Sequence, residues 1–212
     1  MLKINEIFYS IQGESTYAGF PFVFIRLTGC SLRCNWCDTR YAYDDGKNMS
    51  IDDVLSAVKK YPVQYVEITG GEPLLQKETP ALADALLENG YEVFMETSGA
   101  CDINMISEKV HRIVDVKCPD SGMSDKMDWK NLHRLRKNDE VKFVIASRKD
   151  FEFAVEKVNK NKQLQNFPLL ISPVWDRVDV KELSSWILEA GLLFRLQLQL
   201  HKIIWPDVER GV

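Results

Sequence analysis

The feature that most constrains the fold of this chain is the alternation of short apolar segments with segments of helical spacing. Apolar runs bounded by glycine or polar residues predict strands over 22–27, 65–69, 92–96, 113–117, 141–146, 169–172 and 196–200. Helical spacing predicts helices over 51–60, 81–88, 128–135, about 149–159 and 181–190, with Ser50 as the N-cap of the first and Asn89-Gly90 ending the second. Strands that alternate with helices in this way predict βαβ units and a parallel sheet with crossovers of one hand.

The length of the chain limits how far such a sheet can close. A complete eight-fold β/α barrel needs about 250 residues, whereas this chain has 212. No repeat, low-complexity tract or Pro/Gly/Ser-rich linker divides it. We therefore predict an α/β protein with an incomplete parallel β/α barrel, built as a single domain over residues 1–212.

Composition and charge exclude several classes of function. The formal net charge is −4 and the sequence pI is about 5.5, which gives no electrostatic case for binding nucleic acid. No apolar run approaches the roughly 20 residues that span a bilayer, and the first residues lack the pattern of a signal peptide. We expect a cytoplasmic protein, in which the five cysteines are thiols or metal ligands rather than disulfides.

Polar or glycine residues repeatedly follow the predicted strands. Parallel α/β folds place their functional sites at the carboxyl ends of the strands, so these residues predict the position of the site. They are Gly29-Cys30, Gly70-Gly71-Glu72, Thr97-Ser98-Gly99, Lys117 and His201.

Three cysteines lie close together after the first of these strands. Cys30, Cys34 and Cys37 are separated by three and then two residues, so their thiolates can converge on one soft-metal centre. Three protein ligands suit a four-iron cluster with one iron left open for a ligand from outside the protein. We interpret the segment as an iron–sulfur site.

Two other interpretations of the cysteines remain open. A structural zinc site normally needs four protein ligands, and the nearest histidine is His111 while Cys101 and Cys118 stand alone. Three buried thiols without a ligand role are the other alternative. We expect Cys101 and Cys118 to be packing thiols.

The spacing Cys-X3-Cys-X2-Cys resembles the signature of the radical S-adenosylmethionine (SAM) superfamily. The segment from Ile68 to Pro73, with its two adjacent glycines, resembles the motif that holds the SAM amino group in that superfamily. Glycine permits close approach of the backbone, and strand-end carbonyls together with Glu72 can accept from an ammonium. The resemblance implies a 4Fe-4S cluster and SAM as cofactors; a simple tight turn at Gly70-Gly71 is the alternative.

Further strings extend the resemblance over nearly the whole chain. In order, they are Asn5 to Glu14, Phe24 to Leu27, Cys37 to Thr39, Glu96 to Gly99, Asp115 to Pro119 and Gln199 to Lys202. Together they closely resemble the 7-carboxy-7-deazaguanine synthase family of queuosine and deazapurine biosynthesis. The resemblance implies conversion of 6-carboxy-5,6,7,8-tetrahydropterin to 7-carboxy-7-deazaguanine with loss of ammonia, regeneration of SAM and a need for Mg2+. It also implies a homodimer and an external electron donor such as flavodoxin.

The same resemblance implies a role for individual residues. Substrate-binding positions would be Ile11, Gln12, Gly13, Glu14, Arg26, Thr69, Glu96 and His201. SAM-binding positions would be Trp36, Cys37, Asp38, Gly71, Asp115, Val116 and Lys117, and Thr39 would bind Mg2+. A pterin presents a guanidine-like edge and a carboxylate, which suit the acceptors Gln12 and Glu14 and the planar fork of Arg26. The radical itself would reside on the cofactor, so no catalytic side chain is predicted.

Several of these side chains also have a purely structural interpretation. Arg26 can be an ion-pair residue of its strand, Glu14 a solvated carboxylate, Thr39 a turn cap, His201 a core histidine and Lys117 a surface charge. Trp36 can shield the cluster instead of contacting SAM.

The sequence departs from the family pattern at two places. Ser15 stands where the family usually has glycine after Gln-Gly-Glu, which affects the backbone angles of that loop. The tail from Pro206 to Val212 is variable in the family, so whether its end reaches the substrate stays open.

Two other functions compete with a synthase. An activase that installs a glycyl radical on a protein partner would share the cysteine spacing but not Gln12-Gly13-Glu14, Arg26 or the segment 199–202. A small iron–sulfur or zinc module without catalysis would need a fourth protein ligand and no SAM pocket.

Overall fold

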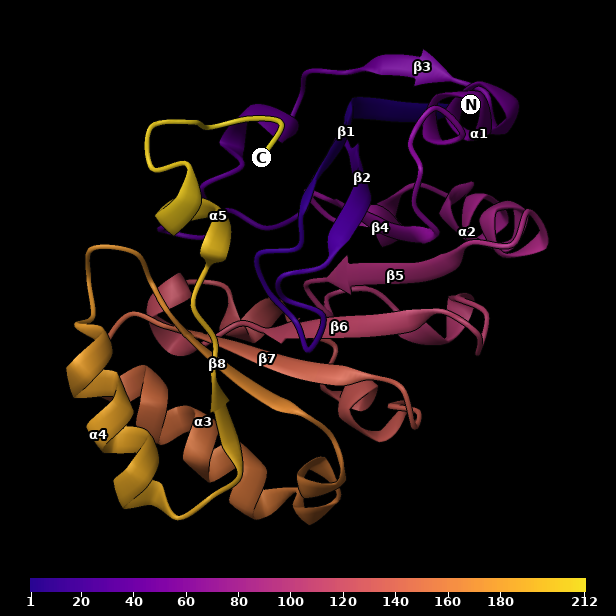
Figure 1. Ribbon diagram of the computed structural model, residues 1–212. Helices are drawn as coiled ribbons and strands as arrows, with labels where there is room; N and C mark the ends of the chain where they lie inside the picture. The colour runs from indigo at the N-terminus through magenta and orange to yellow at the C-terminus, as the bar shows by residue number, and fades with distance from the viewer.

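The computed structural model describes residues 1–212 and contains one nine-stranded sheet with strand order β3-β1-β2-β4-β5-β6-β7-β8-β9 (Figure 1). The strands are β1 (Leu2–Ile11), β2 (Pro21–Leu27), β3 (Lys47–Met49), β4 (Tyr65–Gly70), β5 (Glu92–Thr97), β6 (His111–Val116), β7 (Glu140–Ile145), β8 (Leu169–Pro173) and β9 (Phe194–Leu196). The α-helices are α1 (Ile51–Val58), α2 (Thr79–Glu88), α3 (Arg148–Lys160), α4 (Val180–Ala190) and α5 (Leu200–Ile204).

The direction of the strands confirms the predicted incomplete parallel barrel. From β2 through β4 to β9, every neighbouring pair is parallel. Only β1 breaks the pattern, because it pairs antiparallel with both β2 and β3. The sheet does not close, and β3 and β9 form its two edges.

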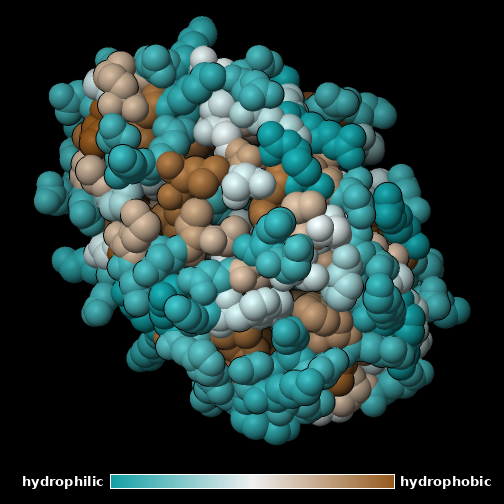
Figure 2. Space-filling view, turned by 180° about the vertical axis from the view of Figure 1, so that it is seen from behind, coloured by the Kyte–Doolittle hydropathy of each residue, from teal (hydrophilic) through white to brown (hydrophobic).

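Two apolar layers lie between the sheet and its outer helices. The first joins Val54 and Val58 of α1 and Leu82 and Leu86 of α2 to the early strands. The second joins α3 and α4 to the late strands, through residues such as Phe151. Figure 1 shows the same division, with α1 beside the start of β1, α2 beside β4 and β5, and α3 and α4 beside the late strands. The face of the molecule shown in Figure 2 is mainly hydrophilic, with hydrophobic groups gathered in several separate patches.

The inner face of the sheet changes from apolar to charged along the strands. Phe8, Phe22, Phe24, Phe94 and Ile113 pack together as an apolar floor inside the barrel. Alternate residues of a strand share one face, so the next inward positions lie two residues further on. In β2, β5 and β6 these positions are Arg26, Glu96 and Asp115. The fold therefore raises a layer of charges above a hydrophobic floor, at the carboxyl ends of the parallel strands.

Most predicted elements are present within a residue or two of the expected bounds. Ser50 caps α1 through a capping box with Asp53, as the sequence predicts. The predicted helix over 128–135 is wrong in type, because the segment forms a 3-10 helix, Trp129–His133, with the Asp128 side chain accepting from the Lys130 amide.

The last predicted strand is displaced and two strands were missed. β9 ends at Leu196, and the chain then turns away so that the Leu200 amide donates to Gly13 O at 3.0 Å and α5 begins. β1 and β3 were not predicted. They form an antiparallel extension of the sheet, and the alternation of strands and helices predicts only its parallel part.

Candidate active site

A cavity of about 610 Å³ opens at the carboxyl ends of the strands. Its walls come from β1 and the segment after it, from β2, the cysteine loop, β4 to β7, the segment after β8 and the C-terminal segment. Of the residues predicted for substrate, cofactor or metal, those that line it are Ile11, Gln12, Gly13, Glu14, Arg26, Cys30, Cys34, Trp36, Cys37, Asp38, Thr39, Thr69, Gly71, Glu96, Asp115, Lys117 and His201. The fold therefore brings these separate motifs to one cavity.

Val116 is the one predicted site residue whose side chain lies elsewhere. It is fully buried and packs in the second apolar layer. Its neighbours Asp115 and Lys117 face the cavity, and strand alternation turns Val116 to the opposite side. Any contact from Val116 to a ligand has to come from its backbone.

The cysteine loop is anchored to the ends of β4 and β6. The Glu72 amide donates to Gly29 O at 2.8 Å, and the Asn35 side chain donates to Asp120 O at 2.8 Å. A Cβ on Gly71 would lie 2.2 Å from Gly29 O and 2.8 Å from the Cβ of Cys30. Gly71 thus permits a contact between the glycine-rich turn and the cysteine loop that any side chain would prevent.

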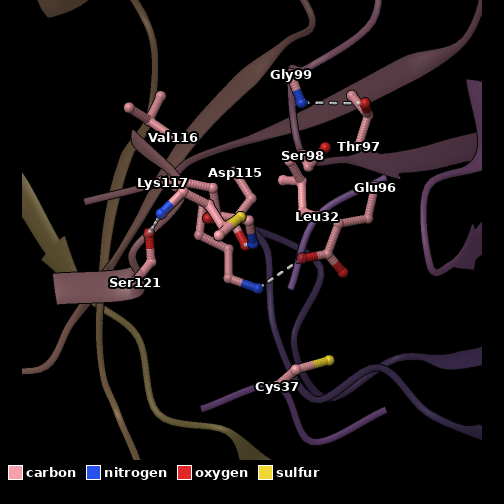
Figure 3. Close-up of polar contacts among 12 residues, drawn as sticks. Leu32, Cys37, Glu96, Thr97, Ser98, Gly99, Asp115, Val116, Lys117 and Ser121 are labelled. Carbon is pink, nitrogen blue, oxygen red and sulfur yellow. Dashed lines mark hydrogen bonds and ion pairs between the residues drawn. The ribbon is translucent and has the colours of Figure 1, made fainter. Parts of the chain in front are cut away.

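The donor set of the loop fits an iron–sulfur cluster. Cys30, Cys34 and Cys37 are partly buried and line one side of the cavity, and Cys37 points into the space opposite Glu96 and Asp115 in Figure 3. No three His, Cys, Asp or Glu side chains lie close enough to share a single ion. Ligands of a four-iron cluster each bind a different iron, so they stand further apart than ligands of one ion. Burial raises the pKa of the Cys30 and Cys34 thiols, and coordination would hold them as thiolates.

Asp115 provides a second sign that the cavity takes a ligand. Its Oδ2 accepts from the Lys117 ammonium at 2.7 Å, whereas its buried Oδ1 has no hydrogen-bond partner in the protein. Buried polar atoms are normally paired. An unpaired carboxylate oxygen in the cavity wall therefore suits a ligand with a donor, which SAM possesses.

Glu72 has a structural role instead of the ligand role considered for it. Its carboxylate accepts from the Leu74 and Ser98 amides at 3.0 and 2.7 Å and from the hydroxyls of Thr97 and Ser98. It is fully buried and does not line the cavity. The interpretation that Glu72 accepts from the SAM ammonium is not supported, because its carboxylate is already occupied by donors of the protein.

The segment after β1 forms another wall of the cavity. The Gln12 side chain is fixed at both ends, since its Nε2 donates to Glu67 Oε2 at 2.5 Å and its Oε1 accepts from the Glu14 amide at 3.1 Å. The Glu14 carboxylate accepts from Gln199 Nε2 at 2.6 Å and from the Lys142 ammonium. Burial opposes ionisation of Glu14, but the charges of Lys142 and His201 and the hydrogen bonds from Lys142 and Gln199 together outweigh it and lower the pKa of Glu14.

Glu67 and Lys142 are cavity residues that the sequence analysis missed. Both are almost fully buried, Glu67 in β4 and Lys142 in β7. Burial, followed by repulsion from Glu96, raises the pKa of Glu67 to about 8. The signal available in the sequence was a charged residue inside each of two predicted apolar strands, 65–69 and 141–146. In each strand this residue lies on the face that points into the barrel.

Arg26 is fixed by one contact and leaves the rest of its fork available. Its Nε donates to Glu6 Oε1 at 2.7 Å, and the Tyr41 hydroxyl donates to the same oxygen at 3.1 Å. The two terminal nitrogens of Arg26 make no hydrogen bond with the protein, although the side chain lines the cavity. Both interpretations of Arg26 thus find a basis, because the residue is ion-paired and also presents donors to the site.

The C-terminal segment forms a further wall of the cavity. The Lys202 ammonium lies 2.8 Å from Asp38 Oδ2 and, against the effect of burial, lowers the pKa of Asp38. A Cβ on Gly13 would lie 2.3 Å from Nδ1 of His201, so the contact between these segments requires glycine there. Burial lowers the pKa of His201. Trp205, Pro206, Val208, Glu209 and Val212 also line the cavity.

Cys101 and Cys118 do not line the cavity. Cys118 is buried in the second apolar layer and Cys101 packs against the first. Burial raises the pKa of both thiols, that of Cys101 to about 11.

Ser15 adopts a backbone conformation that favours glycine, with φ of 64°, and its hydroxyl accepts from the Tyr17 amide at 3.1 Å. We expect Ser15→Ala to lower the free energy of unfolding by about 1 kcal/mol, because it keeps the backbone strain and loses the hydrogen bond. Ser15→Gly loses the same bond but relieves the strain, so it should be the more stable of the two variants. Urea unfolding of both variants tests this, and an alanine variant as stable as wild type would contradict it.

Comparison with known proteins agrees with this arrangement. The family model described as the radical SAM superfamily matches residues 24–120, which include the three cysteines and the glycine-rich turn. A 7-carboxy-7-deazaguanine synthase of Koribacter versatilis is 42% identical over 227 residues and aligns over the whole of both chains. One of Chlorobaculum tepidum is 40% identical, over the whole of this chain and 97% of its own. The crystal structure of QueE from Escherichia coli matches with a TM-score of 0.77 at 25% identity, over 93% of each chain.

The fold, the cysteine loop and the family match define a radical SAM enzyme, whose cofactors are a 4Fe-4S cluster and SAM. Within that class, the full-length relatives place the chain in the 7-carboxy-7-deazaguanine synthase family of deazapurine biosynthesis. The activase and the non-catalytic module are thereby set aside. No helix has the length and apolar character needed to cross a membrane.

Proposed function

We propose that the enzyme converts 6-carboxy-5,6,7,8-tetrahydropterin to 7-carboxy-7-deazaguanine with loss of ammonia, as a single domain over residues 1–212. The observation that carries the proposal is that acceptors and a cationic fork line the same cavity as the cysteine loop. Glu14 and Glu96 supply carboxylates suited to the amino donors of a pterin, while Arg26 supplies the donors suited to its carboxylate.

The cofactors and the protein divide the chemistry between them. When bound, the cluster and SAM supply a radical that abstracts a hydrogen atom from the substrate. SAM would be held on the cysteine side of the cavity by Trp36, Cys37, Asp38, Gly71 and Lys117, by the carboxylate of Asp115 and by the backbone of Val116. Ile11, Gln12, Gly13, Glu14, Arg26, Thr69, Glu96 and His201 would orient the pterin so that its reacting carbon faces that radical.

Anaerobic incubation of the reconstituted enzyme with SAM, a reductant and carboxytetrahydropterin tests the proposal. Formation of the deazaguanine product, identified by mass spectrometry, is the expected result. Cleavage of SAM without any conversion of the pterin would refute the substrate assignment while leaving the enzyme class intact.

We also propose that Thr39 binds Mg2+ together with the substrate carboxylate and water. Thr39 lines the cavity and precedes a 3-10 turn, but its hydroxyl makes no capping hydrogen bond. The Thr39 hydroxyl therefore does not cap the turn. Mg2+ prefers oxygen ligands, so this hydroxyl is a suitable ligand for it.

Turnover should rise with added Mg2+, and Thr39→Val should raise the Mg2+ concentration for half-maximal turnover about 10-fold. Thr39→Ser, which keeps the hydroxyl, is the matched control and should behave like wild type. Equal rates in chelator and in excess Mg2+ would count decisively against the metal.

The remaining expectations concern partners and location. We propose a homodimer that receives electrons from a flavodoxin-type donor and works in the cytoplasm. These proposals rest on family membership. Sedimentation and reduction assays with a purified donor test them.

A further inference from the structure

A buried lysine links two parts of the proposed substrate site that lie far apart in the sequence. Lys142 stands at an inward position of β7, between Glu140 and Val144, while Val141, Phe143 and Ile145 pack outward in the core. Its side chain is only 5% exposed. A cation at such a position has to be compensated, because burying an unpaired charge is costly.

The compensation comes from two carboxylates on different elements. The Lys142 ammonium donates to Glu96 Oε1 of β5 at 2.6 Å and to Glu14 Oε2 of the segment after β1. It thus bridges two walls of the cavity, across the top of β6. Glu14 is further fixed by Gln199, so the distance between the two carboxylates is set by the protein before any ligand binds.

The charges around Lys142 determine what the pair of carboxylates can bind. The groups that face it are Glu67 from β4, Glu96 from β5, Asp115 and Lys117 from the end of β6, Glu14, Asp38 from the cysteine loop, and His201 from α5. Asp115 and Asp38 already have lysine partners of their own, at 2.7 and 2.8 Å, and Glu67 is bonded to Gln12. Lys142 is consequently the cation assigned to Glu14 and Glu96.

We propose that Lys142 is a positioning residue that holds Glu14 and Glu96 as a fixed pair of acceptors for the amino donors of a guanidine-like ligand edge. This inference rests on the proposed function, which supplies the pterin as that ligand. Ion pairs buried with good geometry also resist rearrangement, so the pair is preorganised for binding. Loss of Lys142 would leave two neighbouring carboxylates repelling one another and raise the pKa of both.

Two substitutions separate the charge of Lys142 from its bulk. Lys142→Met keeps the length of the side chain and removes the ammonium, and Lys142→Arg keeps a cation. We expect Lys142→Met to lower kcat/KM for carboxytetrahydropterin about 10- to 100-fold near neutral pH, mainly through KM. SAM binding and substrate-free SAM cleavage should stay within about 2-fold, because the Lys142 ammonium donates to Glu14 and Glu96 and makes no hydrogen bond to a residue assigned to SAM. Lys142→Arg should recover much of the loss.

The pH profile provides a readout that a merely structural role would not move. Removing the ammonium raises the pKa of Glu14 and Glu96, so the acidic limb of kcat/KM should shift to higher pH in Lys142→Met and the deficit should shrink as pH rises. Lys142→Arg should keep the wild-type limb. Lys181→Met, which removes an exposed lysine from α4, is the matched control and should leave every parameter unchanged.

The outcomes are distinguishable. If wild-type enzyme gives no deazaguanine product, the proposed function fails; if it does and Lys142→Met matches it at every pH, the inference fails. A variant with lowered thermal stability and an unshifted profile also overturns the inference, since Lys142 is then only structural. Should Lys142→Met not fold, Lys142→Met/Glu96→Gln removes one of the repelling charges, and normal substrate affinity in that double variant would refute the proposal.

Discussion

Replacing Cys34 with alanine is expected to abolish the reconstituted four-iron cluster, and Cys30→Ala and Cys37→Ala are expected to do the same. The three thiols lie on one anchored loop and face the cavity, so each would hold a separate iron. A three-ligand site has no spare protein donor to replace a lost thiolate. Iron and sulfide analysis, together with the absorption of the reconstituted protein, measures the effect.

Cys101→Ala is the strictest control for this prediction. Burial, followed by repulsion from Glu72 and then from Cys30, raises the pKa of Cys101, so Cys101 lies near enough to the cysteine loop to be a demanding control. Because Cys101 does not line the cavity, its alanine variant should keep full iron and sulfide content, as should Cys118→Ala. A cluster retained in Cys34→Ala, or lost in Cys101→Ala, would show that the ligands have been assigned wrongly.

The parallel part of the fold could be predicted because each of its strands carries its own local signal. β2 and the strands from β4 to β8 are short, mainly apolar and bounded by glycine or polar residues. β1 differs because Asn5, Glu6 and Tyr9 interrupt its apolar pattern, and its pairing with β2 and β3 is antiparallel. The pairing of β1 with β2 and β3 therefore indicates this strand more clearly than its own apolar pattern does.

The candidate site could be predicted only as far as its motifs reach. The cysteine loop and the glycine-rich turn are local patterns, so their place in the cavity followed from the sequence. Lys142 belongs to no motif, and its partner Glu14 is 128 residues away. A charged residue in an apolar strand can face solvent, another subunit or a site, and only the fold decides which. The same holds for Glu67, whose neighbours Gln12 and Glu96 come from other strands or loops.

Glu72 shows the opposite error. Its place in the glycine-rich motif suggested a ligand for an ammonium, yet four hydrogen-bond donors of the turn and of β5 occupy it. A carboxylate that satisfies the backbone at a strand end is invisible in the sequence, because the donors are mostly amides and hydroxyls supplied by the fold. The Glu72 carboxylate thus holds the glycine-rich turn against the end of β5.

Arg26→Ala is expected to lower turnover of carboxytetrahydropterin by about 10- to 150-fold, without loss of the cluster or of SAM binding. The terminal nitrogens of Arg26 have no partner in the protein and the side chain lines the cavity, so they are available for the substrate carboxylate. Losing one charged hydrogen bond typically costs about 1.5–3 kcal/mol, which corresponds to that range. If the reacting carbon also moves by about 1 Å, a further loss on the order of 100-fold follows.

Two further variants accompany this test. Arg26→Lys keeps the charge but loses both the fork and the planar geometry that Glu6 and Tyr41 hold, so it should also be impaired. Arg195→Ala, which removes an exposed arginine from β9, is the matched control and should be silent.

The decisive measurement is substrate turnover and substrate-free SAM cleavage in the same preparations. A substrate-binding arginine affects the first and spares the second, because the groups that would hold SAM and the cluster are other residues. If Arg26→Ala lowers both rates equally, the residue acts through the fold of its strand and through Glu6. If product formation is unchanged, the carboxylate of the substrate is bound elsewhere in the cavity, which is also lined by Lys117, Lys142 and Lys202.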